Sequence, residues 1–190
     1  MSFDRAVTTR KSVWGMGATI LWKVVLANFC ILVVMISTIF FFNYKWLLWI
    51  MEVIYLSMVI AFIASPMNNR GHRDVGFYER NPEKRDPLYG LKAGLIGAAP
   101  FYLTTLVLLF MTLGFLPDYF LAYRALNAYF WPVISLVVPA GDYVIDLQWY
   151  QYLIFLLMQS AIPITCHIAY TLGLKDIILT DKILYKKQEK

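Results

Sequence analysis

Residues 147–174, LQWYQYLIFLLMQSAIPITCHIAYTLGL, contain no aspartate, glutamate, lysine or arginine. An α-helix rises about 1.5 Å per residue, so about 20 apolar residues cross the hydrocarbon core of a bilayer. The backbone finds no water to bond inside a bilayer, and a helix satisfies its N–H and C=O groups internally. This stretch therefore predicts a membrane-spanning helix.

Three further stretches have the same character. Residues 24–44 and 93–116 are uncharged, and residues 46–67 contain one acid, Glu52. Of the 190 residues, 60% are hydrophobic and 15% are charged, whereas a soluble domain has about 25% charged residues. This composition excludes a water-soluble globule, a disordered tail and a disulfide-stapled secreted module. We expect an all-α membrane protein, residues 1–190 forming one domain with four transmembrane helices in two antiparallel hairpins.

Lysine and arginine are distributed unevenly between the segments that join these helices. With four spans, all of them except Lys45 and Arg124 lie on one side, in residues 1–23, the loop 68–92 and the tail 175–190. Cytoplasmic segments carry the excess of basic residues in membrane proteins. We therefore expect a plasma-membrane protein, of bacterial type, with both termini in the cytoplasm. The net charge of +5 is then a topology signal, and we expect no nucleic-acid partner.

The outer segment 117–146 contains an apolar stretch, 125–141, that Pro132 and Pro139 interrupt. A fifth span here would move the C-terminal tail across the membrane and weaken the charge asymmetry. We expect this proline-broken segment to start and end on the outer side. It either lies in the interface or re-enters the bilayer.

Glu52 is the only formal charge inside a predicted span. It lies about 10 Å from the outer boundary at Lys45. An intramembrane carboxylate is costly and is by default a candidate functional residue. Glu52 is either a proton or cation site, or a carboxyl group that bonds to Lys45 or to a neighbouring helix.

Gln159 and His167 lie on one face of the last predicted span, together with Pro163 and Tyr170. A semi-polar face is expected to point into the bundle and to form hydrogen bonds between helices. A proton relay from His167 to Glu52 is disfavoured, because their depths in the bilayer differ by roughly 10 Å.

The loop 68–92 is long for a connection between packed helices, and it mixes charged with aromatic residues. We expect it to bind a cytoplasmic protein, a second copy of the chain or anionic lipid headgroups; a solvated connector is the alternative. The candidate docking residues are Arg70, Arg73, Phe77, Tyr78, Arg80, Lys84, Arg85 and Tyr89.

Acidic and aromatic residues gather on the expected outer side. Carboxylates on a loop suit Ca²⁺, and aromatic rings suit an organic cation. The plainer interpretation is an aromatic belt at the level of the headgroups. The candidates are Asp118, Trp131, Asp142, Asp146 and Trp149.

The small residues Gly90, Gly94 and Ala98 recur every four positions, which predicts close packing between helices. We find no converging nucleophile, base or metal ligands in the sequence, and we expect no enzyme activity, cofactor or metal. The favoured function is an accessory or structural subunit of a membrane complex that docks a partner through residues 68–92. The alternative is a small transporter, or a component of one, that uses Glu52 and the outer acidic and aromatic face.

Overall fold

The computed structural model describes residues 12–38, 44–138, 144, 147–175 and 177, which form helices and no strand. The described part of the chain contains four helical stretches long and apolar enough to cross a membrane, as the sequence predicts. They are α1 (Val13–Thr38), α2 (Lys45–Arg80), the stretch Pro82–Thr112 with α3 (Tyr89–Thr112), and the stretch Trp149–Leu174, which comprises α6 (Trp149–Gln159) and α7 (Ala161–Leu174).

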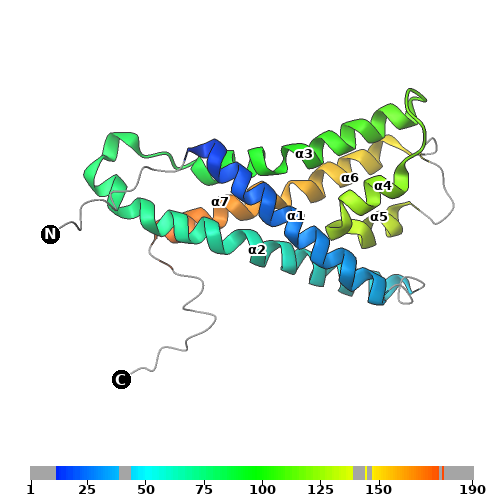
Figure 1. Cartoon of the computed structure of the whole chain (residues 1–190), viewed down its shortest axis with the longest axis horizontal. Helices are drawn as coiled ribbons and strands as arrows, with labels where there is room; N and C mark the ends of the chain where they lie inside the picture. Colours follow the sequence, from blue (N-terminus) through cyan, green and yellow to red (C-terminus); the bar gives the residue numbers. More distant parts are fainter. Residues whose placement is uncertain (1–11, 39–43, 139–143, 145–146, 176, 178–190) are drawn as a thin grey trace, which may run out of the picture.

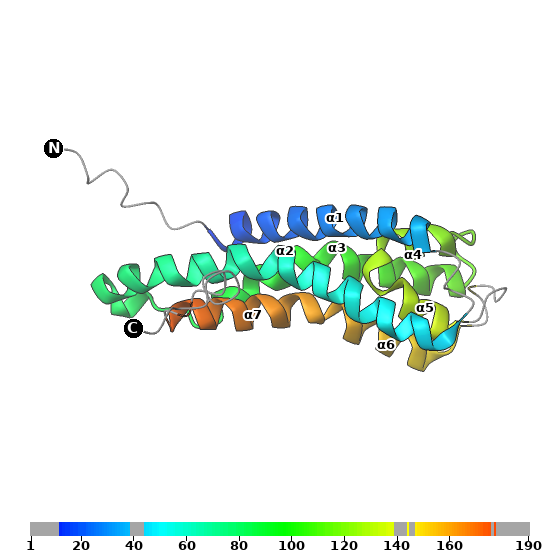
Figure 2. The same ribbon diagram turned by 90° about the horizontal axis from the view of Figure 1, so that it is seen from below.

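The long helices form an elongated bundle (Figure 1). Seen from below, α1 lies on one side and α6 with α7 on the other (Figure 2). Helices α1 and α7 each contact both α2 and α3. The contacts do not single out the two expected hairpins, because α2 packs most extensively on α7, and α3 packs on both α7 and α1.

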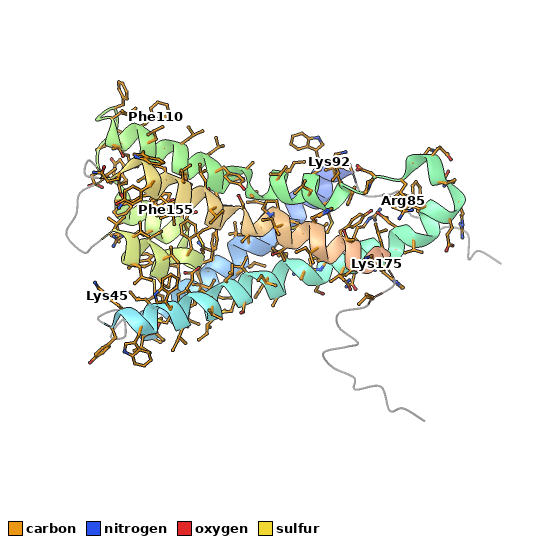
Figure 3. All side chains as sticks on the ribbon, turned by 180° about the vertical axis from the view of Figure 1, so that it is seen from behind. Lys45, Arg85, Lys92, Phe110, Phe155 and Lys175 are labelled. Atoms are coloured by element: carbon orange, nitrogen blue, oxygen red, sulfur yellow. The ribbon has the colours of Figure 1, made fainter. Side chains whose placement is uncertain are left out.

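The two ends of the bundle differ in charge. Arg85, Lys92 and Lys175 lie together at one end, and Lys45 lies at the other (Figure 3). We call the first the basic end; it also has the 3₁₀ turn η3 (Pro82–Lys84). The opposite, distal end contains α4 (Phe120–Leu126), the turn η4 (Ala128–Phe130) and α5 (Trp131–Val137).

Two helices extend beyond the boundaries expected from the sequence. Helix α1 begins at Val13, so Lys23 lies inside it, and Glu52 is not the only charged residue within a spanning helix. Helix α2 continues through Pro66 to Arg80, so most of the expected loop 68–92 is helical. A proline inside a helix removes one hydrogen bond, yet α2 continues past Pro66 and packs closely on α7 five residues later, at Gly71.

That packing depends on glycine. A Cβ atom at Gly71 of α2 would overlap the carbonyl oxygen of Tyr170, and one at Gly173 of α7 would overlap that of Asn68. In α3, a Cβ at Gly94 would lie 2.6 Å from the Cα of Pro163, and one at Gly90 would lie 2.8 Å from the carbonyl oxygen of Cys166. The close helix packing predicted from the small residues of α3 is therefore present, and its partner is α7.

Candidate functional site

Asp74 is buried at the basic end, in the part of α2 that was expected to be a loop; 1% of it is exposed. One carboxylate oxygen lies 2.8 Å from the guanidinium of Arg70, one helical turn earlier. The other accepts a hydrogen bond of 2.9 Å from the hydroxyl of Tyr170, which lies 2.9 Å from the hydroxyl of Tyr78. We call Arg70, Asp74, Tyr78 and Tyr170 the Asp74 network. It fastens the end of α2 to α7.

Two further contacts strengthen this junction. The side-chain amide of Asn68 donates to the carbonyl oxygens of Ala169 at 3.3 Å and Ile177 at 2.8 Å. The ring of Tyr89, at the start of α3, packs on the ring of Tyr170 with 5.1 Å between centroids. The basic end is thus a closely packed, hydrogen-bonded junction of α2, α3 and α7.

The candidate docking residues differ in how far they are exposed in the structure. Tyr78 and Tyr89 are buried, and the side chain of Arg70 is 12% exposed, so these three support the surface and do not form it. Phe77 is half-buried. The exposed members are Arg73, Arg80, Lys84 and Arg85.

A cavity of about 210 Å³ lies at the basic end, beside the last turns of α2. Its walls come from the end of α2, the turn η3 and the end of α7, and they combine apolar side chains with one acid and one base. The lining residues are Val75, Tyr78, Glu79, Pro82, Arg85 and Leu174.

Gln159 connects three elements in the distal half of the bundle. Its amide nitrogen lies 2.8 Å from both the carbonyl oxygen of Phe101 and the hydroxyl of Thr105, and 3.4 Å from the amide oxygen of Asn127. Asn127 in turn donates to the hydroxyl of Thr104 at 3.0 Å. These bonds join α3, α6 and the turn after α4, and they have a structural role.

Asn28 of α1 bonds to the backbone between the end of α4 and η4, a role that the sequence analysis missed. Its amide nitrogen donates to the carbonyl oxygens of Ala125 and Leu126, both at 3.0 Å, and its oxygen accepts from the backbone N–H of Tyr129 at 3.3 Å. Asn28 precedes the end of α1 by ten residues, or about 15 Å of helix. The available signal was an asparagine in the middle of the apolar stretch 24–44, whose other asparagine, Asn43, lies next to its end.

Glu52 is buried where α2 packs against η4 and α5, with 5% of the residue exposed. Neither carboxyl oxygen has a hydrogen-bond partner among the described residues. The backbone N–H of Val133 in α5 approaches the carboxyl group without completing a hydrogen bond. Tyr129, from η4, is close enough to interact electrostatically with Glu52, and its fully buried hydroxyl also has no partner in the described part of the chain.

His167 is far from this carboxyl group. Its Cα atom packs against Gly90 at the start of α3, and its buried Nδ1 atom has no hydrogen-bond partner in the described structure. Because Tyr170 lies opposite Gly71, Glu52 and His167 are separated by on the order of 20 Å along the bundle. The gap exceeds the one expected from the sequence and leaves the two residues without a direct connection.

Asp118 has a local structural role at the distal end. It accepts hydrogen bonds from the backbone N–H of Phe120 at 2.9 Å, at the start of α4, and of Val144 at 3.4 Å. Trp131 is half-buried and Trp149 is 73% exposed. Asp142 and Asp146 lie outside the described residues, and the described residues contain no cluster of three or more His, Cys, Asp or Glu that would hold a metal ion.

A larger cavity, of about 520 Å³, opens between α3 and α6. It is mainly apolar, and Glu52 is not among its lining residues. The lining residues are Tyr102, Thr105, Leu106, Leu109, Thr112, Leu147, Trp149, Tyr152 and Leu156.

The described residues form four helical stretches whose length and composition fit an integral membrane protein. Comparison with protein-family models, with curated proteins and with solved structures finds no match. A function therefore has to be argued from the geometry and chemistry of the residues themselves.

Proposed function

We propose that the protein is a non-enzymatic accessory subunit of a membrane complex, and that it docks a cytoplasmic partner protein through the basic end. The observation that carries the proposal is the buried Asp74 network. It holds the end of α2 rigidly on α7, whereas a solvated connector would need no such internal ion pair.

A rigid surface favours docking because less conformational entropy is lost when a partner binds. The exposed arginines Arg73, Arg80 and Arg85 lie on or beside this rigid element. Arginine is enriched at protein interfaces, and complementary charge raises association rates and selects partners. The cavity of about 210 Å³ next to Arg85 is a suitable place for an apolar side chain of the partner.

The partner chemistry that suits this surface is an acidic protein segment with one apolar anchor. The test replaces Arg73, Arg80 and Arg85 together by glutamate in the full-length protein, expressed in its native membrane. The matched control replaces the same three residues by lysine, which keeps the charge. We expect quantitative mass spectrometry to show that partner recovery falls roughly tenfold or more in the glutamate variant only, because placing like charges together costs several kcal/mol.

Equal recovery of the same proteins by the two variants would refute the docking proposal. Anionic headgroups are the other ligand that basic residues at a membrane surface attract. Native mass spectrometry of the purified protein separates the two cases. Loss of bound anionic lipid with unchanged protein partners would identify a lipid contact instead.

A second candidate function is a small transporter or a component of one. It is favoured by one specific observation, the burial of Glu52 without a hydrogen-bond partner among the described residues. If the protein transports a substrate with the help of Glu52, the variant Glu52→Gln should abolish substrate uptake in intact cells while the protein level stays the same. Unchanged uptake would exclude Glu52 from any transport step.

A further inference from the structure

We infer that Glu52 and Tyr129 form an exchangeable proton-binding site within the membrane-spanning part of the protein. The inference stands on the local geometry of α2, η4 and α5. It holds for an accessory subunit and for a transporter alike, and it concerns a different part of the molecule from the docking surface.

An ionised Glu52 would be a charge buried in the membrane-spanning part of the protein. A carboxylate buried without an ion pair or hydrogen bonds is expensive, and a buried acid in that situation takes up a proton. Glu52 is buried, both of its oxygens lack a partner among the described residues, and no described basic side chain pairs with it. The neutral carboxylic acid is therefore the resting form of this side chain.

Polar groups from η4 and α5 lie near the carboxyl group of Glu52. Tyr129 presents a buried hydroxyl from η4, and Val133 presents a backbone N–H from α5. Tyr55, one turn further along α2, has its hydroxyl 3.2 Å from that of Thr38, so it is already engaged. A tyrosine hydroxyl either donates or accepts a hydrogen bond. The Tyr129 hydroxyl does not bond to Glu52 in the structure, but its chemistry suits it both to accept from a protonated acid and to donate to a carboxylate.

A local movement that brings Tyr129 and Val133 within hydrogen-bond distance of Glu52 supports both protonation states. On proton release the carboxylate gains the hydrogens of Tyr129 and Val133, and on uptake the new O–H group donates to the Tyr129 oxygen. The reaction is a simple protonation of one oxygen and needs no other reactant. Glu52 lies about 10 Å of helix from the start of α2 at Lys45, so the distal end is the nearer of the two ends of the bundle.

The same surroundings argue against a metal cation. Sodium and calcium ions are held by several oxygen ligands. Near Glu52 one of the approaching groups is an N–H, which repels a cation, and the described residues contain no metal-binding cluster.

The test uses the full-length protein in lipid vesicles at pH 8 and dicyclohexylcarbodiimide, an apolar reagent that reacts with protonated carboxyl groups. An exposed glutamate, with a pKa of about 4.3, is protonated in roughly one molecule in five thousand at this pH. We expect mass spectrometry to show labelling of Glu52 that exceeds labelling of the exposed Glu79 and Glu83 roughly a hundredfold or more. The variant Glu52→Gln, which mimics the neutral acid, loses that label.

If the reagent does not reach Glu52, infrared spectroscopy of the same vesicles tests whether its carboxyl group is protonated. We expect a carbonyl band of an un-ionised carboxylic acid that disappears in Glu52→Gln, shifts in D₂O and changes position in Tyr129→Phe. A wild-type spectrum without this band would overturn the proposal, and a band that does not shift in D₂O would overturn proton exchange. If sodium ions protect Glu52 from the reagent, the site binds a metal cation and the proton-site proposal is wrong.

Discussion

Helix α2 contains two buried acids, Asp74 near the basic end and Glu52 near the distal end, and their surroundings are opposite. Asp74 has an arginine on one oxygen and a tyrosine hydroxyl on the other. Glu52 has no hydrogen-bond partner among the described residues. A buried charge that is fully paired has a structural role, whereas a buried acid without hydrogen-bond partners remains able to bind a ligand such as a proton. The comparison separates the structural acid of this protein from its candidate functional acid.

The largest expected effect follows removal of the paired acid. Asp74→Ala leaves the mostly buried guanidinium of Arg70 without its partner, and breaking a buried pair in this way costs about 3–5 kcal/mol. The free energy of unfolding in mixed detergent micelles measures this loss. The control is Lys92→Ala, which removes an exposed ion pair with Asp86 and should cost less than about 1 kcal/mol. Similar losses in the two variants would show that the Asp74 network is not a buried structural unit.

A smaller effect is expected where α2 touches α7 next to this network. Gly71→Ala introduces a methyl group against the backbone of Tyr170 and should lower the free energy of unfolding by about 1–3 kcal/mol. Gly76→Ala is the matched control on the same helix, because a Cβ atom there meets nothing within 4 Å. The control should raise the stability by about 0.5–1 kcal/mol, since alanine is the better helix former. If both variants are equally stable, the close contact of α2 with α7 does not exist.

Removing a neutral polar group should have the smallest effect of the three. Gln159→Leu takes away the hydrogen bonds to Phe101 and Thr105 and should cost about 0.6–1.7 kcal/mol, the range found for bonds between membrane helices. Ser57→Ala serves as the control, because the exposed Ser57 bonds only to the carbonyl oxygen of Val53 in its own helix. Unfolding measurements that do not distinguish the two variants would remove Gln159 from the structural core.

The four spanning helices could be predicted from the sequence because lipid imposes a simple rule on apolar stretches of sufficient length. The ends of the helices could not, because tertiary contacts decide them. Helix α1 contains Lys23 in its interior. Helix α2 passes through Pro66 and packs closely on α7 at Gly71.

The candidate site was predictable in part for similar reasons. Glu52 stands alone in an apolar stretch, and its isolation is visible in the sequence. Asp74 lies among other charges and was not among the predicted site residues; its spacing of four from Arg70, which suits an ion pair along a helix, was the available signal. Tyr129 lies 77 positions after Glu52 in the sequence, and only the tertiary fold brings the two residues near each other. A local sequence pattern does not predict such a contact.

The contrast between the two acids is tested most directly by neutralising each one with its isosteric amide and comparing the free energies of unfolding. Asp74→Asn removes a charge that Arg70 requires, and we expect a loss of about 2–5 kcal/mol. Glu52→Gln replaces a neutral acid by a neutral amide and removes no buried charge, so we expect a change of at most about 1 kcal/mol. Equal losses in the two variants would contradict the distinction, because Glu52 would then be a charged structural residue like Asp74.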